Sequence, residues 1–133
     1  MRTDLELLRE ATHVLVVDLE ATCSEDRAIP PDQMETIEIG AVLVRLPDFA
    51  IGGEFQSFVR PVRHPVLLPF CTKLTGITQG MVDGATLFPE AFAALRNRLI
   101  SGRSGLVFGS WRPEGRVDGR GRRRRRRPAR RMN

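Results

Sequence analysis

The sequence of 133 residues has few of the residues on which disulfide frameworks and zinc sites depend. It contains two cysteines, two histidines and one tryptophan, and no tyrosine. No His/Cys cluster has the spacing of a zinc site. Two cysteines without a secretory signal are typical of reduced thiols in the cytoplasm. We therefore expect Cys23 and Cys71 to be free thiols that fill the core, with no disulfide between them.

Long apolar segments are also missing. No hydrophobic run is long enough to cross a bilayer. The N-terminal stretch MRTDLELLREATH mixes acids and bases where a signal peptide has its apolar stretch. These absences predict a protein without a membrane partner. The chain is 41% hydrophobic and 28% charged, which is the composition of an ordinary globular protein, and its length suits a single domain.

Charge is distributed unevenly along the chain. Residues 1–111 contain 10 basic and 14 acidic side chains, a net charge of −4, whereas residues 112–133 contain 11 arginines and two acids, a net charge of +9. The second segment includes six consecutive arginines and almost no apolar residue, so it cannot bury a core. We predict a mildly acidic folded part, residues 1–111, followed by a disordered Arg-rich tail, residues 112–133.

Hydrophobic periodicity predicts an α/β domain. Three successive strands with short connections favour an antiparallel meander. The amphipathic helix after them favours a right-handed crossover to a parallel fourth strand. Thr3 fits the start of a capping box, and Gly76 fits a helix end. The expected elements are a helix at 4–11, strands at 13–18, 36–46 and 54–60, a helix at 88–100 with apolar residues at 88, 92, 95 and 99, and a strand at 106–108.

The first predicted strand leads into two carboxylates, Asp18 and Glu20. Because alternate side chains of a strand share a face, both project in the same direction. Two anions on one face repel unless a cation lies between them, and carboxylate oxygens suit Mg²⁺ or Mn²⁺. Two such ions can hold the attacking and leaving oxygens of a phosphodiester. The alternative is that the strand ends at Asp18 and both carboxylates face water.

Four sequence blocks occur in an informative order: V-V-D-L-E-A-T-C at 16–23, E-T-I-E-I-G-A-V-L-V at 35–44, F-C-T-K-L-T-G-I-T-Q at 70–79 and F-G-S-W at 108–111. In order and spacing they resemble the DEDDh 3′–5′ exonucleases, and in particular the branch that trims histone-mRNA and small-RNA ends. The resemblance covers about residues 12–111. It implies an RNase H-like fold whose mixed sheet joins a three-stranded antiparallel meander to one parallel strand.

The same resemblance implies roles for individual residues. Asp18 and Glu20 would be ligands in a two-metal site for Mg²⁺ or Mn²⁺, and Glu20 would help to position the attacking water. The 3′ end of RNA or single-stranded DNA would be the binding partner. Its terminal nucleotide would contact the backbone of Ala21 and Thr22 and the loop made of Leu74, Thr75, Gly76 and Ile77.

Other side chains that could take part in chemistry have simpler explanations. Glu38 could approach the metal face, but we favour a solvated strand residue. We expect His64 at the surface and not as a base. Phe70 could pack on a nucleic-acid base, although a Phe in a helical turn is more often part of the core. Trp111 fits an ordinary packing residue at a strand end.

The sequence departs from the family pattern after Trp111. Family members have a catalytic Asp within a few residues, and later a His that acts as general base and a further Asp. Here the next acids are Glu114 and Asp118 among Arg and Gly, and no His follows His64. We therefore expect a domain truncated at its C-terminus that is inactive alone. A partner that supplies the missing acids is a further alternative.

Two explanations of the tail at 112–133 remain open. Arg, Gly, Pro and Ala are encoded by GC-rich codons, so a frameshift in a GC-rich gene just after Trp111 would produce such a run. A genuine RNA-binding arm would instead bind phosphates without sequence preference, which gives a non-enzymatic nucleic-acid-binding protein. We favour the frameshift, because the resemblance stops at a single point.

Overall fold

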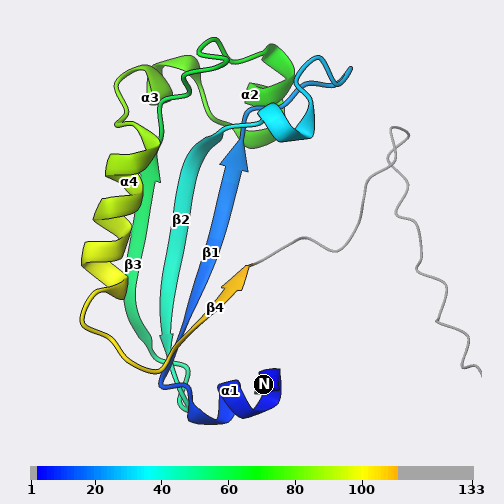
Figure 1. Cartoon of the computed structure of the whole chain (residues 1–133). Coiled ribbons are helices and arrows are strands. Elements are labelled where there is room, and N and C mark those ends of the chain that lie inside the picture. Colours follow the sequence, from blue (N-terminus) through cyan, green and yellow to red (C-terminus); the bar gives the residue numbers. More distant parts are fainter. Residues whose placement is uncertain (1–2, 111–133) are drawn as a thin grey trace, which may run out of the picture.

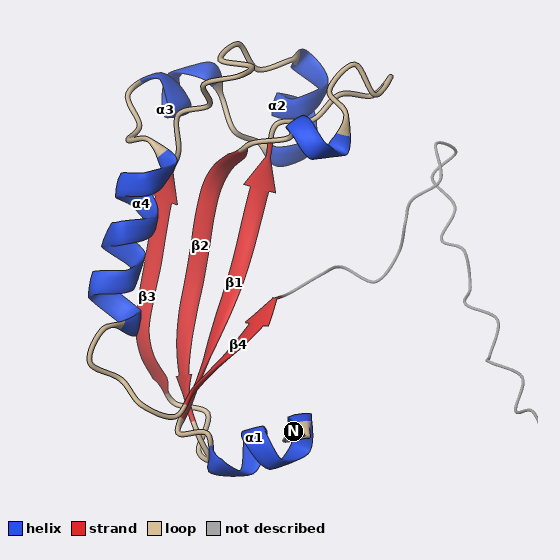
Figure 2. Cartoon of the chain, in the orientation of Figure 1, coloured by secondary structure: helices blue, strands red, loops and turns tan. Residues whose placement is uncertain are grey.

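The computed structural model describes residues 3–110, so the predictions for Trp111 and for the tail lie outside the described residues. Four strands form one mixed sheet, with helices at its ends and along one face (Figure 1, Figure 2). In chain order the elements are α1 (Asp4–Glu10), β1 (His13–Ala21), the 3₁₀ turn η1 (Pro31–Gln33), β2 (Thr36–Arg45), β3 (Ile51–Phe58), α2 (Pro69–Thr75), α3 (Gln79–Asp83), α4 (Phe88–Leu95), its π-helical continuation η2 (Arg96–Ile100) and β4 (Leu106–Ser110).

The sheet has the order β3-β2-β1-β4. β1 pairs antiparallel with β2, β2 pairs antiparallel with β3, and β4 joins the free edge of β1 in parallel. The predicted meander and the parallel fourth strand are therefore confirmed. β3 begins earlier than predicted, because Gly53 pairs with Leu43 on β2 and does not form part of the turn.

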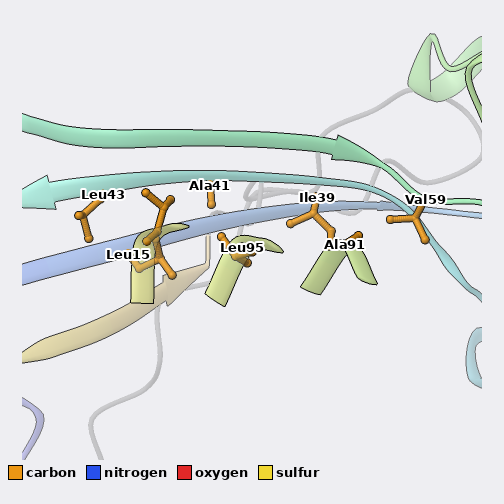
Figure 3. Packing of buried hydrophobic residues seen from close by; sticks show 8 residues of the cluster. Leu15, Ile39, Ala41, Leu43, Val59, Ala91 and Leu95 are labelled. Atoms are coloured by element: carbon orange, nitrogen blue, oxygen red, sulfur yellow. The ribbon is translucent and has the colours of Figure 1, made fainter. Parts of the chain in front are cut away.

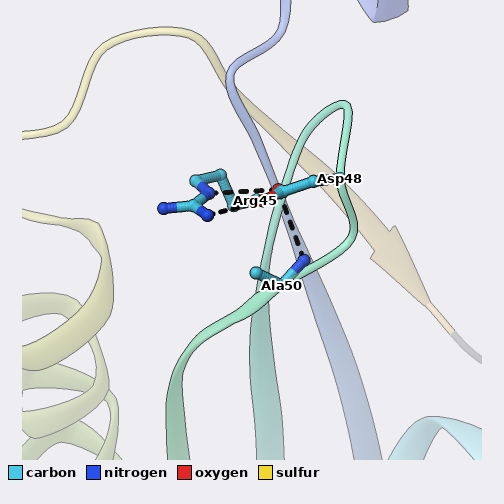
Figure 4. A network of polar contacts seen from close by, with 3 residues as sticks. All are labelled: Arg45, Asp48 and Ala50. Carbon is cyan, nitrogen blue, oxygen red and sulfur yellow. Dashed lines mark hydrogen bonds and ion pairs between the residues drawn. The ribbon is translucent and has the colours of Figure 1, made fainter.

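A charged pair closes the turn between β2 and β3. Arg45 donates from Nε to Asp48 Oδ1 at 3.0 Å and also from Nη2 to Asp48 Oδ2, and the Ala50 N–H donates to the same carboxylate (Figure 4). The Arg45 guanidinium lowers the pKa of Asp48 to about 2. Both side chains are exposed, so the pair defines the turn and adds little stability.

The helices begin and end where local signals place them. Thr3 caps α1 reciprocally: the Glu6 N–H donates to Thr3 Oγ1 at 3.2 Å, and the Thr3 N–H donates to Glu6 Oε2 at 2.8 Å. Gly76 ends α2 in the left-handed region with φ 76°, which glycine adopts without steric cost. Both predicted signals are confirmed. Among residues 3–110, no helix combines the length and apolar character needed to span a membrane.

The main hydrophobic core lies between the sheet and α4. Its buried side chains come from β1, β2, the end of β3 and the helix (Figure 3): Leu15, Ile39, Ala41, Leu43, Val59, Ala91, Leu95 and Leu99. The helix therefore buries the stripe 91, 95 and 99. The prediction that 88 and 92 belong to the same buried face is wrong, because Phe88 and Phe92 are 45% and 44% exposed.

An apolar groove separates α4 from β1 and β4. It has a volume of about 320 Å³, and its lining is apolar except for Arg96: Leu15, Val17, Leu19, Ile39, Phe88, Phe92, Leu95, Arg96, Ile100 and Phe108. The Phe88 and Phe92 rings stack at 6.0 Å along one wall. On the other wall Leu19 is 52% and Phe108 62% exposed. Within residues 3–110 this part of the sheet therefore has apolar side chains that no helix covers.

The groove predicts surface behaviour that can be measured. We expect the chain to enhance the fluorescence of a hydrophobic dye and to self-associate, because contiguous exposed apolar surface favours both. Phe92→Gln should reduce both effects. Val66→Gln is the control, since Val66 is 73% exposed but lies outside the groove. A monomer with low dye binding and one cooperative melt would contradict this prediction.

Candidate active site

Two carboxylates project from the C-terminal part of β1. The strand continues to Ala21, so the alternative in which it ends at Asp18 is wrong. Leu15, Val17 and Leu19 line the groove beside α4. Asp18 and Glu20 therefore share the opposite face of the sheet. Asp18 is exposed and Glu20 is half-buried, so the carboxylate oxygens of both residues are accessible to an ion or a substrate.

A third carboxylate lies directly across from the pair. Glu38 on β2 is the register partner of Glu20, and its Oε2 accepts a hydrogen bond from Gln56 Nε2 at 2.9 Å. Partial burial, together with the negative charges of Asp18 and Glu38, raises the pKa of Glu20 above its ordinary value. Glu38 is thus a half-buried strand residue on the carboxylate face, and its side chain is engaged by Gln56.

The carboxylates of Asp18 and Glu20 fit a hard divalent cation, but they supply two ligand side chains where a closed metal site has more. Within residues 3–110, no three His, Cys, Asp or Glu side chains converge to hold a metal ion. Asp18 and Glu20 offer carboxylate oxygens from one face, and a cation there would offset the partial burial and the nearby negative charges that raise the pKa of Glu20. Mg²⁺ and Mn²⁺ accept one or two carboxylates and complete their coordination with water or phosphate oxygens.

The chain immediately after Glu20 is held in place by Glu35. The register of β1 and β2 shifts between Glu20 and Ala21. The Thr22 N–H then donates to Glu35 O at 2.8 Å, and the Glu35 N–H donates to Thr22 Oγ1 at 2.9 Å. Thr22 is only 2% exposed. The backbone at Ala21 and Thr22 is therefore fixed beside the carboxylates, where the predicted contact with a terminal nucleotide requires it.

The Glu35 side chain also organises the loop after β3. Its carboxylate accepts hydrogen bonds from the backbone N–H groups of Val62, Arg63 and His64 at 2.8, 2.7 and 2.9 Å. Burial alone would raise the pKa of Glu35, but these three donors outweigh it and lower the pKa below its ordinary value. Sequence reasoning missed this residue. No local pattern marks it, because Glu35 and its backbone donors are 27 to 29 residues apart in the chain.

We expect Glu35→Gln to destabilise the fold. The variant replaces a charged acceptor of three hydrogen bonds, which should lower the free energy of unfolding by about 1–3 kcal/mol at neutral pH. The folded-state pKa of Glu35 lies below its ordinary value of 4.5, so this contribution is fully present above that pH and is lost as the pH falls through the folded-state value. Urea denaturation should therefore separate the two proteins at neutral pH, and the difference should shrink as the pH falls through the folded-state pKa.

Glu25→Gln is the matched control for this experiment. Glu25 is an exposed carboxylate in the loop after β1. Its replacement should change the free energy of unfolding by less than about 0.5 kcal/mol. Equal losses in the two variants would show that the hydrogen bonds of Glu35 do not stabilise the loop.

The predicted second substrate segment lies at the end of α2, and α2 contacts the end of β1. Cys71 Sγ in α2 donates to Ala21 O at 3.7 Å. Beyond the helix, the Ile77 N–H donates to Thr75 Oγ1 at 3.1 Å. Leu74 is 67% exposed, whereas Ile77 is 3% exposed in a second core cluster. The structure therefore places the second predicted segment at the end of the helix that contacts Ala21, with the Leu74 side chain exposed and Ile77 buried.

The sequence predicted a core position for Phe70 and a surface position for His64, and both side chains are half-buried. Phe70, for which a core position was favoured, is only half-buried and lies with Lys73 and Leu74 at an open cavity of about 480 Å³. His64 is half-buried, and its backbone N–H is bound by Glu35. Neither side chain is part of the carboxylate pair.

The two cysteines are free thiols. Cys71 is buried, and Cys23 is half-buried against the cluster that contains Cys71. Burial raises the pKa of Cys23 to about 12, and a hydrogen bond with Cys71 and the negative charge of Glu20 act in the same direction. The Cys23 thiol therefore remains protonated at neutral pH, which is the form that suits a packing residue and not a metal ligand.

Comparison with known proteins identifies the family of the chain. The sequence profile of the RNase T exonuclease family matches residues 15–104. The chain belongs to this exonuclease family. Its similarity is to the DEDDh 3′–5′ exonucleases of the ERI1 branch, and the fold is the α/β fold of RNase H-like exonucleases, with β1 and β4 parallel.

Curated relatives match about half of the chain. ERI1 exoribonuclease 2 of Danio rerio is 43% identical over 72 residues, which are 54% of this chain and 13% of the relative. ERI1 exoribonuclease 3 of Homo sapiens is 44% identical over 72 residues, which are 54% of this chain and 20% of the relative. The chain thus spans one fifth or less of the length of these relatives.

Solved exonuclease structures give the same result. A 3′-exonuclease bound to the histone mRNA stem-loop superposes with a TM-score of 0.61 at 37% identity, covering 65% of this chain and 38% of that one. Cell-death related nuclease 4 superposes with a TM-score of 0.69 at 25% identity, covering 76% of this chain and 35% of that one.

Proposed function

We propose that this exonuclease-family domain binds a divalent cation and the 3′-terminal nucleotide of RNA or single-stranded DNA. The observation that carries the proposal is the joint position of Asp18 and Glu20 on one face at the end of β1. Partial burial and the negative charges of Asp18 and Glu38 raise the pKa of Glu20, so a cation is the natural counterpart. Asp18 and Glu20 would hold Mg²⁺ or Mn²⁺, which would supply charge stabilisation for a phosphodiester.

The chain's own groups position the nucleotide in this proposal. The backbone of Ala21 and Thr22 is anchored through Glu35 on one side. On the other side, Leu74 and Phe70 present apolar surface on α2. A terminal base between these two segments would place its phosphate toward the carboxylate face. The similarity to a 3′-exonuclease that recognises the histone mRNA stem-loop supports RNA as one such substrate.

We further propose that the 133 residues do not hydrolyse phosphodiesters alone. Hydrolysis needs a group that takes the proton from the attacking water. Within residues 3–110, His13 lies at the opposite end of β1 from Glu20, and the His64 backbone is bound by Glu35. No histidine follows His64 in the sequence. Glu20 can orient a water molecule, but neither histidine of the described residues 3–110 is assigned to take the proton from it.

Paramagnetic Mn²⁺ tests the proposed metal site. It should broaden the amide NMR signals of residues 18–21 in the wild-type chain, and Asp18→Asn should abolish the broadening. Glu54→Gln is the matched control, because Glu54 is an exposed carboxylate on the same sheet face, opposite Val42. Broadening that persists in Asp18→Asn, or is lost equally in Glu54→Gln, would refute the site.

A further inference from the structure

A further cavity opens beside the loop that Glu35 holds. It has a volume of about 520 Å³ and lies where the start of β2, the loop after β3 and the first residues of α4 meet. Its lining consists of Met34, Glu35, Thr36, Val59, Arg60, Val62, Arg63, Leu87, Phe88 and Pro89. The proposed metal ligands and the proposed contacts of the 3′-terminal nucleotide include none of these residues.

Hydrogen bonds of the backbone fix the walls of this cavity. The Val59 N–H donates to Ile37 O at 2.8 Å, which attaches the end of β3 to β2. The Arg60 N–H donates to Thr86 O at 2.9 Å, which attaches the next residue to the segment before α4. The Glu35 carboxylate holds the following part of the loop through three backbone N–H groups. The cavity is therefore a preformed surface and not an opening in a free loop.

The lining combines apolar surface with two positive charges. Val62 is 67% and Phe88 45% exposed, so both present apolar surface to solvent. Arg60 and Arg63 are also exposed, and neither guanidinium has a hydrogen bond or an ion pair with another residue of the part of the chain that the structure describes. The acid in the lining is Glu35, whose carboxylate is occupied by backbone N–H groups. The cavity thus offers apolar surface for a flat ring and two unpaired cations for an anion.

Glu35 connects this cavity to the proposed nucleotide site. The Thr22 N–H donates to Glu35 O at 2.8 Å, and the Glu35 N–H donates to Thr22 Oγ1 at 2.9 Å. The same residue lines the cavity. A single strand whose 3′ end lies against the backbone of Thr22 therefore has this cavity as a neighbouring surface for the nucleotides that precede the end.

We propose that the cavity binds the nucleotides that precede the 3′-terminal one in a single strand; this assignment rests on the function proposed above. Arg60 and Arg63 bind phosphate oxygens, and a base lies on the apolar surface of Val62 and Phe88. Stacking on an aromatic ring accepts any base, and cations bind phosphates without regard to sequence. The cavity therefore favours an unpaired strand but selects no sequence, and it makes the chain bind an oligonucleotide more tightly than a mononucleotide.

Amide NMR shifts of the full chain distinguish the two sites. The probes are uridine 5′-monophosphate and tetrauridylate, each with Mg²⁺. The mononucleotide should shift the signals of residues 21–22 and 74–77, whereas tetrauridylate should also shift those of residues 60, 62, 63 and 88. A salt concentration of about 200 mM weakens the non-specific attraction to the arginines at 112–133.

A double variant tests the two arginines. Arg60→Gln with Arg63→Gln should lower the affinity for tetrauridylate at least about fivefold and reduce its salt slope by about 1, because phosphate contacts are lost. The affinity for uridine 5′-monophosphate should not change. Arg103→Gln is the matched control, since Arg103 is an exposed arginine before β4 and outside the cavity. Phe88→Leu keeps an apolar side chain but removes the ring, and it should weaken binding of tetrauridylate alone.

The failures of the two proposals give different results. If tetrauridylate shifts residues 21–22 and 74–77 but not 60–63, the cavity is overturned and the proposed function stands. If it shifts neither set, or 60–63 alone, the proposed terminal site is refuted and the assignment of the cavity with it. Equal losses in Arg103→Gln and in the double variant overturn the cavity. A hexaglutamate peptide that shifts residues 60–63 as strongly as tetrauridylate would indicate a surface for acidic peptides and would also overturn it.

Discussion

The purified chain is expected to leave a labelled single-stranded RNA or DNA oligonucleotide intact in the presence of Mg²⁺ or Mn²⁺. Asp18 and Glu20 provide two ligands on one sheet face, and no third ligand converges with them within residues 3–110. A general base contributes about 10²- to 10⁴-fold to such reactions, and the geometry supplies none. Denaturing gel electrophoresis after prolonged incubation measures the outcome.

Asp18→Ala separates intrinsic activity from contamination in this assay. Ladder-like shortening from the 3′ end that disappears in Asp18→Ala would show that the 133 residues hydrolyse nucleic acid, and would overturn the expected inactivity. Shortening that persists in Asp18→Ala would come from another nuclease. An active DEDDh exonuclease, assayed under the same conditions, confirms that the substrate can be degraded.

Deletion of residues 112–133 is expected to remove most of the affinity for single-stranded nucleic acid. That segment has a net charge of +9, whereas residues 1–111 have −4. Neutralising six to ten phosphates makes affinity fall by about 10³- to 10⁵-fold between 50 and 200 mM salt. Fluorescence polarisation of a labelled oligonucleotide at several salt concentrations measures both the loss and the salt slope.

Substitution of the six arginines at 122–127 provides the matched comparison. Replacement by lysine keeps the charge and should retain most of the affinity, because the attraction is to phosphates. Replacement by glutamine should lower the affinity and flatten the salt slope. A deletion variant that binds as tightly as the full chain at equal salt would place the binding in the folded part and contradict this prediction.

Local signals in the sequence correctly predicted several parts of the fold. The capping box at Thr3 and the end of α2 at Gly76 depend on residues a few positions apart, and both formed as expected. The alternation of side chains along a strand placed Asp18 and Glu20 on one face before any partner strand was known. The strand pairing followed from short connections and the handedness of crossovers.

Contacts between distant segments explain where the structure differs from the predictions made from the sequence. The predicted stripe on α4 included Phe88 and Phe92, but burial of a helix face depends on where the sheet lies, and the sheet contacts Ala91 and Leu95. The sequence shows periodicity, but it does not show which arc of the helix meets β1 and β2. The two phenylalanines consequently line the apolar groove.

The sequence by itself determined the family, the order of the elements and the carboxylate pair on β1, because each depends on spacing along one segment. The tertiary structure alone decided three further features. The strand register placed Glu38 opposite Glu20. The path of the loop after β3 brought three N–H groups to Glu35. The packing of α2 against the end of β1 joined Cys71 to the backbone of Ala21. These pairings connect residues far apart in the chain, and their partners are selected by the closing of the core and not by any local pattern.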